Sequence, residues 1–269
     1  MGLTYVYPVL SRRAGGISIG INLTPNNACN WACVYCQVPN LIRGSAPPLN
    51  TKQLENELTK MLHEVMYGSF MNEYAPPEYR RLNDIAFSGN GEPTSSKEFL
   101  VAMNIVHHAL EQFGLMNKIK VVLITNGSHI QEQKIHPALI QLNNMNGEIW
   151  FKVDRATPEG IWSTNQIHLQ PKTILERLAI ATSLCKTYIQ TCMTQWNGAD
   201  PSEEEVAHYL DFLAKVRKRQ IPIQGIWLYS LARPSLQPNQ EHVTPVSNAW
   251  LKDLAHRIQL QGFLVTVTP

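Results

Sequence analysis

GISIGINLTPNNACNWACVYC, residues 16–36, joins an apolar segment to a loop that carries three cysteines. Residues 16–24 predict a strand, and this strand runs straight into the loop. Cys29, Cys33 and Cys36 follow with the spacing C-x3-C-x2-C. The question for the rest of the chain is which fold places such a loop at the end of its first strand.

Apolar and amphipathic segments alternate along most of the chain. We predict strands at residues 16–24, 83–89, 119–127, 147–154, 187–196 and 221–232, and a final strand at 263–269. Helices are predicted at residues 51–66, 96–113, 136–144, 172–185, 202–220 and 248–262. Strand-then-helix units in this order favour right-handed crossovers and a parallel sheet covered by helices. An open doubly wound sheet and an incomplete barrel both fit, and both place site residues at the carboxyl ends of strands.

No low-complexity segment or linker interrupts the chain, so we predict a single domain over residues 1–269. The segment SLARPSLQPNQEHVTP, residues 230–245, follows the sixth strand and is rich in proline. We interpret it as a lid or an edge cover. Ser202 follows Pro201 and precedes three glutamates, which predicts the start of a helix.

The composition is that of a globular protein and excludes several classes. Of the 269 residues, 44% are hydrophobic and 16% are charged, and the net charge of +2 gives no general attraction to nucleic acid. No apolar run reaches the roughly 18–20 residues that span a bilayer, so we expect no membrane association. Five cysteines without a secretory signal do not predict a disulfide scaffold. We therefore expect a cytoplasmic protein.

The number of clustered cysteines limits the metal chemistry. A structural zinc site needs four protein ligands, and Cys185 and Cys192 lie far downstream of the other three. Zinc stays an alternative if a distant residue completes the set. Three thiolates on a four-iron cluster leave one iron open to a substrate or cofactor.

The motif C-x3-C-x2-C after the first strand, with Tyr35 just before the last cysteine, resembles the radical S-adenosylmethionine (SAM) superfamily. The resemblance covers residues 16–232 and leaves 233–269 as a C-terminal extension. It implies an α/β fold, a partial (βα)6 TIM-like barrel with a short N-terminal extension and a C-terminal helix and strand. It also implies a [4Fe-4S] cluster on the three cysteines, with SAM on the open iron. Reductive cleavage of SAM then gives a 5′-deoxyadenosyl radical that abstracts hydrogen from a substrate.

Later strand ends extend the resemblance. SGNGEPT, residues 88–94, resembles the family's Gly-Gly-Glu-Pro motif, with Asn90 in place of a glycine. Glycines there allow close approach of the backbone. The motifs imply cofactor contacts at Gly89, Asn90, Gly91 and Glu92, at Thr125 and Asn126 of the TNG turn, and at Tyr35 near the adenine.

The fourth and fifth strands add polar candidates. Alternation places Lys152 and Asp154 on one face, where buried charges need partners. The resemblance implies Lys152 for the cofactor carboxylate and Asp154 for the ribose or the substrate, with a mutual salt bridge as the alternative. Gln190 is a candidate cofactor contact. Cys192 is a candidate catalytic thiol that donates or receives hydrogen, although most free cysteines are buried apolar residues.

SRRAGGISIG, residues 11–20, together with the cysteine loop resembles more weakly a group of stand-alone Fe–S oxidoreductases related to the tRNA wyosine-synthesis branch. The expected partners are an electron donor such as flavodoxin or ferredoxin and a substrate that is an RNA nucleoside, a glycyl-radical protein or a small metabolite. A non-catalytic iron–sulfur or zinc module for electron transfer or binding is the alternative.

Overall fold

One curled sheet organises the chain in the computed structural model, which describes residues 2–11 and 15–268. Its strand order is β1-β2-β5-β6-β7-β8-β10-β12. The bounds are Val6–Ser11, Gly16–Ile21, Leu82–Phe87, Lys120–Thr125, Glu148–Lys152, Thr187–Cys192, Ile226–Tyr229 and Val265–Thr268. Residues 12–14, part of the 11–20 stretch quoted above, lie outside the described residues.

The pairing of the strands confirms the predicted partial barrel. From β2 to β12 every neighbouring pair is parallel, as repeated crossovers require. β1 is antiparallel to β2 and forms one edge. Among the described strands β12 forms the other edge, so the sheet curls without closing.

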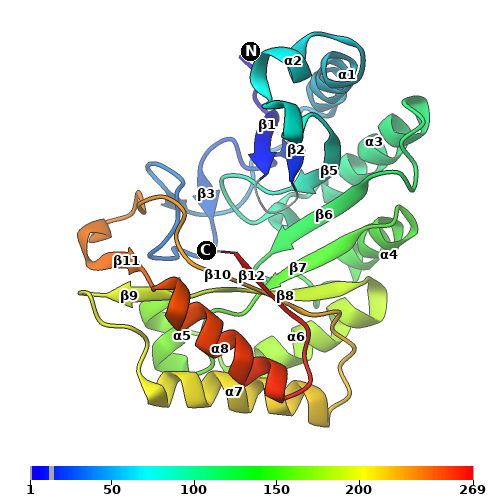
Figure 1. Ribbon diagram of the computed structural model, residues 1–269. Coiled ribbons are helices and arrows are strands. Elements are labelled where there is room, and N and C mark those ends of the chain that lie inside the picture. Colours follow the sequence, from blue (N-terminus) through cyan, green and yellow to red (C-terminus); the bar gives the residue numbers. More distant parts are fainter. Residues whose placement is uncertain (1, 12–14, 269) are drawn as a thin grey trace.

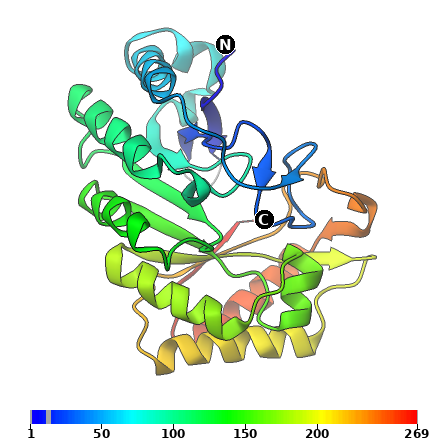
Figure 2. The ribbon, with the colours of Figure 1, turned by 180° about the vertical axis from the view of Figure 1, so that it is seen from behind.

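Helices follow the strands and line the outer side of the sheet, as Figures 1 and 2 show. α1 packs on α3, α3 on α4, α4 on α6, and α7 on α8. The α-helices are α1 Thr51–Tyr67, α2 Phe70–Tyr74, α3 Phe99–Gln112, α4 His136–Asn144, α5 Pro158–Asn165, α6 Pro171–Leu184, α7 Glu203–Lys218 and α8 Asn248–Leu260. Ser202 caps α7 in a capping box with Glu205, which confirms the predicted helix start. None of these described helices has the length and apolar character that a bilayer crossing requires.

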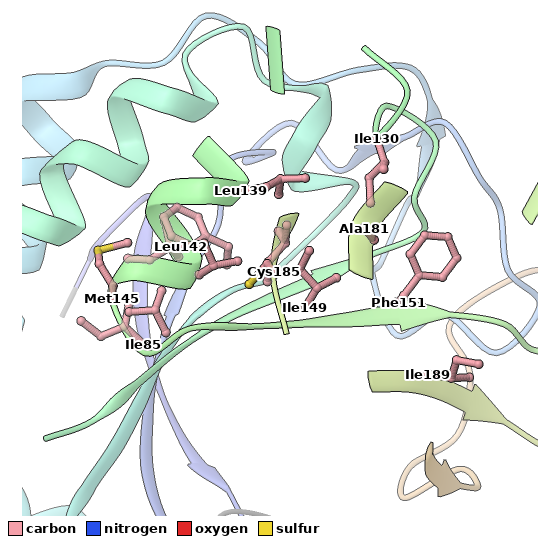
Figure 3. Packing of buried hydrophobic residues seen from close by; sticks show 14 of the residues in the cluster. Ile85, Ile130, Leu139, Leu142, Met145, Ile149, Phe151, Ala181, Cys185 and Ile189 are labelled. Atoms are coloured by element: carbon pink, nitrogen blue, oxygen red, sulfur yellow. The ribbon is translucent and has the colours of Figure 1, made fainter. Parts of the chain in front are cut away.

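The core lies between the sheet and these helices. All six residues of β2 are buried, and Ile19 and Ile21 have no exposed surface. Figure 3 shows Leu139 and Leu142 of α4 among the apolar side chains of the neighbouring strands. Cys185 lies in the same cluster, where burial raises the pKa of its thiol to about 12. Its position is that of a structural, apolar cysteine.

Two predicted strands differ most from expectation. Residues 187–196 form two strands, because β8 ends at Cys192 and β9 (Thr194–Trp196) leaves the sheet to pair with β11 (Val243–Pro245). Of residues 221–232 only Ile226–Tyr229 join the sheet. Pro222 has no N–H to give to a neighbouring strand, and hydrogen bonds to β8 begin at Gln224, whose N–H donates to the Thr187 carbonyl (2.8 Å).

Helix α5 was not predicted, although its sequence carries helix-start residues. Thr157 accepts a hydrogen bond from the Gly160 N–H at its N-terminus, and Pro158 occupies the first turn. The helix lies directly after the end of β7 and therefore on the side of the sheet where the site is expected. The short strands β3 (Ala28–Cys29) and β4 (Ile42–Arg43), which pair in parallel, were not predicted either.

Candidate functional site

A cavity of about 500 Å³ lies at the carboxyl ends of the strands. Every predicted site residue except Thr125 and Asp154 lines it: Cys29, Cys33, Tyr35, Cys36, Gly89, Asn90, Gly91, Glu92, Asn126, Lys152, Gln190 and Cys192. These residues come from five loops and strand ends that are far apart in the sequence. The fold thus brings together what the motifs predicted, at the edge of the sheet where ligands of parallel α/β proteins bind.

The three loop cysteines form one side of this cavity. Cys29 ends β3, and a turn closed by the Cys36 N–H and the Cys33 carbonyl (2.9 Å) follows. Within residues 2–11 and 15–268, no three His, Cys, Asp or Glu side chains form a site for a single metal ion. Cys29, Cys33 and Cys36 all line the cavity, and three thiols from one loop are a donor set that fits an iron–sulfur cluster.

Burial affects the protonation of these thiols. It raises the pKa of Cys29 to about 12 and that of Cys33 to about 11. Both groups therefore hold their protons at neutral pH unless a metal replaces them.

The loop after β5 is shaped by two glycines. Gly89 has φ of +130°, and a Cβ there would lie 2.6 Å from Asn22 Oδ1. A Cβ on Gly91 would lie only 2.0 Å from the carbonyl oxygen of Ala28. Gly91 thus approaches the residue before Cys29, and Gly89 approaches Asn22, which follows β2.

Glu92 connects the loop after β5 to the end of β6 by hydrogen bonds. Its carboxylate is 2% exposed and accepts hydrogen bonds from the hydroxyls of Thr94 and Thr125, both at 2.6 Å, and from the backbone N–H of Asn126 at 2.7 Å. The structure therefore places Thr125 behind the cavity wall, because its hydroxyl is turned toward Glu92. Asn126 reaches the cavity, and its amide nitrogen donates to Asn30 Oδ1 (2.8 Å).

Lys152 and Asp154 do not form the direct salt bridge considered above. Lys152 Nζ lies 3.1 Å from the hydroxyl of Tyr35, and that hydroxyl donates to Asp154 Oδ2 at 2.5 Å. Burial works against a charge on Lys152, but the neighbouring acidic groups outweigh it and raise its pKa above the ordinary value. The lysine therefore presents a positive charge to the cavity.

Asp154 lies behind the wall, with 1% of its surface exposed. Besides the Tyr35 hydroxyl it accepts hydrogen bonds from Asn165 Nδ2 (2.7 Å) and from the backbone N–H of Cys192 (2.9 Å). It was predicted to contact ribose or substrate, yet its contacts are those of a tie between the cysteine loop, α5 and the end of β8. The sequence alone could not separate a ligand contact from a structural contact at Asp154. The alternation of side chains along a strand predicts which face a residue lies on, but not which residues of other segments contact it there.

Gln190 and Cys192 face the cavity from β8. Gln190 is 5% exposed, and among the described residues its side-chain oxygen has no hydrogen-bond partner. An unpaired buried acceptor lowers the free energy of unfolding by about 1–3 kcal/mol. A hydrogen-bond donor on a bound molecule would offset this loss. Cys192 has no exposed surface, and burial raises the pKa of its thiol well above the ordinary value.

The sequence analysis missed Tyr7 of β1, which also lines the cavity. Its ring lies over Gly20, where a Cβ would come within 2.2 Å of it, and its hydroxyl lies 2.8 Å from Ser88 Oγ. Gly20 inside an apolar strand was the available sign, because such a glycine often marks a close approach.

The segment 230–245 was predicted to be a cover, and part of it covers the cysteine loop. Ser235 Oγ donates to the Val34 carbonyl (2.7 Å), and Gln237 Nε2 donates to the Val38 carbonyl (2.7 Å). The Leu236 N–H donates to the Cys36 carbonyl (3.0 Å). We call residues 235–237 the strap.

Comparison with known proteins gives distant relatives. No protein-family model matches the chain. A UPF0026 protein of Helicobacter pylori (strain J99) is 24% identical over 234 residues, which cover 81% of this chain and 65% of the relative. The UPF0026 protein MJ1312 of Methanocaldococcus jannaschii is 26% identical over 241 residues, or 88% of this chain and 65% of the relative. The chain thus spans slightly less than two thirds of the length of these two curated relatives.

Two solved structures are similar over most of the chain. TYW1 with a lysine–pyruvate adduct bound is 15% identical with a TM-score of 0.59, over 90% of this chain and 73% of that one. A radical SAM methyltransferase from Sphaerobacter thermophilus is 13% identical with a TM-score of 0.63, over 100% of this chain and 78% of that one. In fold, the chain is similar to these two solved structures.

Proposed function

We propose that the chain is a radical SAM enzyme that holds a [4Fe-4S] cluster on Cys29, Cys33 and Cys36 and binds SAM beside it. The observation that carries the proposal is the common cavity, which combines three thiols, a lysine ammonium and an unpaired buried acceptor. Bound together, the cluster and SAM supply one-electron chemistry, the reductive cleavage of SAM coupled to abstraction of a substrate hydrogen.

Different residues of the cavity suit different chemical groups of SAM. The positive charge of Lys152 suits the SAM carboxylate, and the free oxygen of Gln190 suits a hydroxyl or amino donor. Gly89, Asn90 and Gly91 offer backbone at the wall. A larger residue would collide with Asn22 at position 89 and with Ala28, the residue before Cys29, at position 91. Tyr35, held by Asp154, forms wall surface for the adenine.

Cys192 is the proposed catalytic thiol. Its raised pKa keeps the S–H intact at neutral pH, and its side chain lies in an apolar cluster with Trp31 and Tyr35. A neutral S–H beside the substrate is suited to giving or receiving a hydrogen atom. Its position on β8, outside the cysteine loop, favours this role over ligation.

The partners belong to the proposal as well. An electron donor such as flavodoxin or ferredoxin supplies the reducing electron, and a reducing cytoplasm is the proposed location. The substrate is an RNA nucleoside, a glycyl-radical protein or a small metabolite; the net charge of +2 favours the latter two.

The test is anaerobic reconstitution with iron and sulfide, followed by dithionite and SAM. We expect about four irons per chain and release of 5′-deoxyadenosine, both lost in Cys29→Ala. Iron binding without release of 5′-deoxyadenosine would support the alternative, a non-catalytic iron–sulfur module. A protein whose iron content is the same with and without Cys29 would overturn the proposal.

A further inference from the structure

We infer that Asn165 is a positioning residue for the cluster: it donates an amide hydrogen to the sulfur of Cys33 and thereby raises the reduction potential. The inference rests on the proposed function, because it requires a cluster on Cys33. It concerns a residue of α5, a helix to which the motifs gave no role.

The end of α5 holds the cysteine loop by its backbone. The N–H of Ala32 donates to the Asn165 carbonyl (3.2 Å), and the N–H of Val34 donates to the Thr164 carbonyl (2.9 Å). Carbonyls in the last turn of a helix have no partner within the helix, so they are available to another segment. Here they fix the backbone on both sides of Cys33.

The side chain of Asn165 adds a contact to the sulfur. Its Nδ2 lies 3.3 Å from Cys33 Sγ and 2.7 Å from Asp154 Oδ2, and the residue is 1% exposed. A carboxylate can only accept, so Asp154 requires the nitrogen of the amide at this position. One amide hydrogen goes to the carboxylate, which leaves the second for the sulfur.

Asp154 is itself held in place. The hydroxyl of Tyr35 and the backbone N–H of Cys192 both donate to it. Because the carboxylate is fixed from two sides, the amide that it orients is fixed as well. The donor to Cys33 is therefore set before any cluster binds.

A hydrogen bond to a cluster sulfur favours the more negatively charged, reduced state. Removal of the Asn165 donor should therefore make the cluster harder to reduce while its three ligands stay in place. The consequence for function is a cluster whose potential depends on a residue 132 positions from its ligand.

The experiment compares reconstituted Asn165→Leu with the unchanged protein. Leucine has a similar volume and no donor, so we expect an unchanged iron content and a more negative midpoint in an EPR-monitored redox titration. Ser163→Ala is the matched control: it lies on the same helix, is exposed, and its hydroxyl contacts the Gly160 carbonyl (3.0 Å). We expect neither quantity to change in that control.

Asn165→Ala is a second variant without a side-chain donor, for the case in which leucine prevents loading. A midpoint equal to that of the unchanged protein in either loaded variant overturns the inference while leaving the proposed function intact. Failure of both variants to load iron, with circular dichroism unchanged, shows a purely structural role and also overturns it. Absence of a four-iron cluster in the unchanged protein overturns the proposed function and the inference together.

Discussion

The hydroxyl of Tyr35 donates a hydrogen bond of 2.5 Å to Asp154 Oδ2 and joins two buried residues 119 positions apart. Tyr35 lies between Cys33 and Cys36 in the sequence, and Asp154 follows the end of β7. The same hydroxyl lies 3.1 Å from Lys152 Nζ. Through the Tyr35 hydroxyl, the cysteine loop is therefore hydrogen-bonded to both charged residues at the end of β7, Lys152 and Asp154.

Loss of this hydroxyl should weaken the fold. Tyr35→Phe leaves a buried carboxylate with one donor fewer, and hydrogen bonds to charged groups contribute about 1.5–3 kcal/mol. We expect a decrease of that size in the free energy of unfolding by urea. Tyr74→Phe, at a residue that is 65% exposed, is the control and should show no change. Equal stability of both variants would contradict the role of the bond.

Gly91→Ala should displace the cysteine loop. Its Cβ would lie 2.0 Å from the carbonyl oxygen of Ala28, the residue before the first cysteine. Backbone atoms cannot yield as a side chain can, so we expect a several-fold loss of reconstituted iron per chain. Gly2→Ala, where a Cβ meets nothing within 4 Å, should load iron normally. Normal loading of both variants would show that the loop tolerates the shift.

Gln190→Leu should stabilise the protein and weaken SAM binding. The substitution removes a buried acceptor without a partner, so we expect a gain of about 1 kcal/mol in the absence of SAM. Loss of one hydrogen bond to the cofactor corresponds to a roughly tenfold higher Kd. Calorimetry of the reconstituted protein measures the second effect. A gain in stability with unchanged affinity would remove Gln190 from the cofactor site.

Cys192→Ala should keep its iron, because the proposed ligands are the three loop cysteines. We expect the iron content of the unchanged protein, whereas Cys36→Ala should lose most of it. Iron analysis after anaerobic reconstitution measures both. Equal losses in the two variants would identify Cys192 as a ligand and remove it from the proposed hydrogen transfer.

Glu57 of α1 should make stability depend on pH. It accepts hydrogen bonds from the backbone N–H groups of Thr4, Tyr5 and Val6, and these lower its pKa below the ordinary 4.5 despite the opposing effect of burial. The stabilisation is complete above the unfolded pKa and disappears as the pH falls through the lower folded value. We expect Glu57→Gln to lose about 1.5–3 kcal/mol at pH 7 and to approach the unchanged protein in acid. A constant difference across this range would contradict the assignment.

The sequence predicted the fold well where the hydrophobic pattern defines a helix and where a polar turn follows a predicted parallel strand. Helix 136–144 has the predicted bounds, and the polar turns after β5 and β6 reach one cavity because parallel strands end on the same side. Residues 88–94 and 125–127 could be identified because their spacing and residue types repeat in a known family.

Contacts between distant segments could not be predicted. Nothing in the residues around Asn165 indicates a cysteine 132 positions away. Thr125 and Asp154 were correctly placed at strand ends, but whether a side chain forms the wall or supports it depends on Glu92 and Tyr35, which come from other loops. Tyr7 was missed because an antiparallel edge strand lies outside the repeating pattern of strand and helix.

The strap sets an order of events during synthesis. Ser235 donates to a carbonyl of the cysteine loop 201 positions earlier, and Gln237 to another 199 positions earlier. On the ribosome, the cysteines emerge long before the residues that cover them. Until then the carbonyls of Val34, Cys36 and Val38 lack the donors that the strap provides. The conformation of the cysteine loop in the folded chain therefore depends on hydrogen bonds from a segment that is made about 200 residues later.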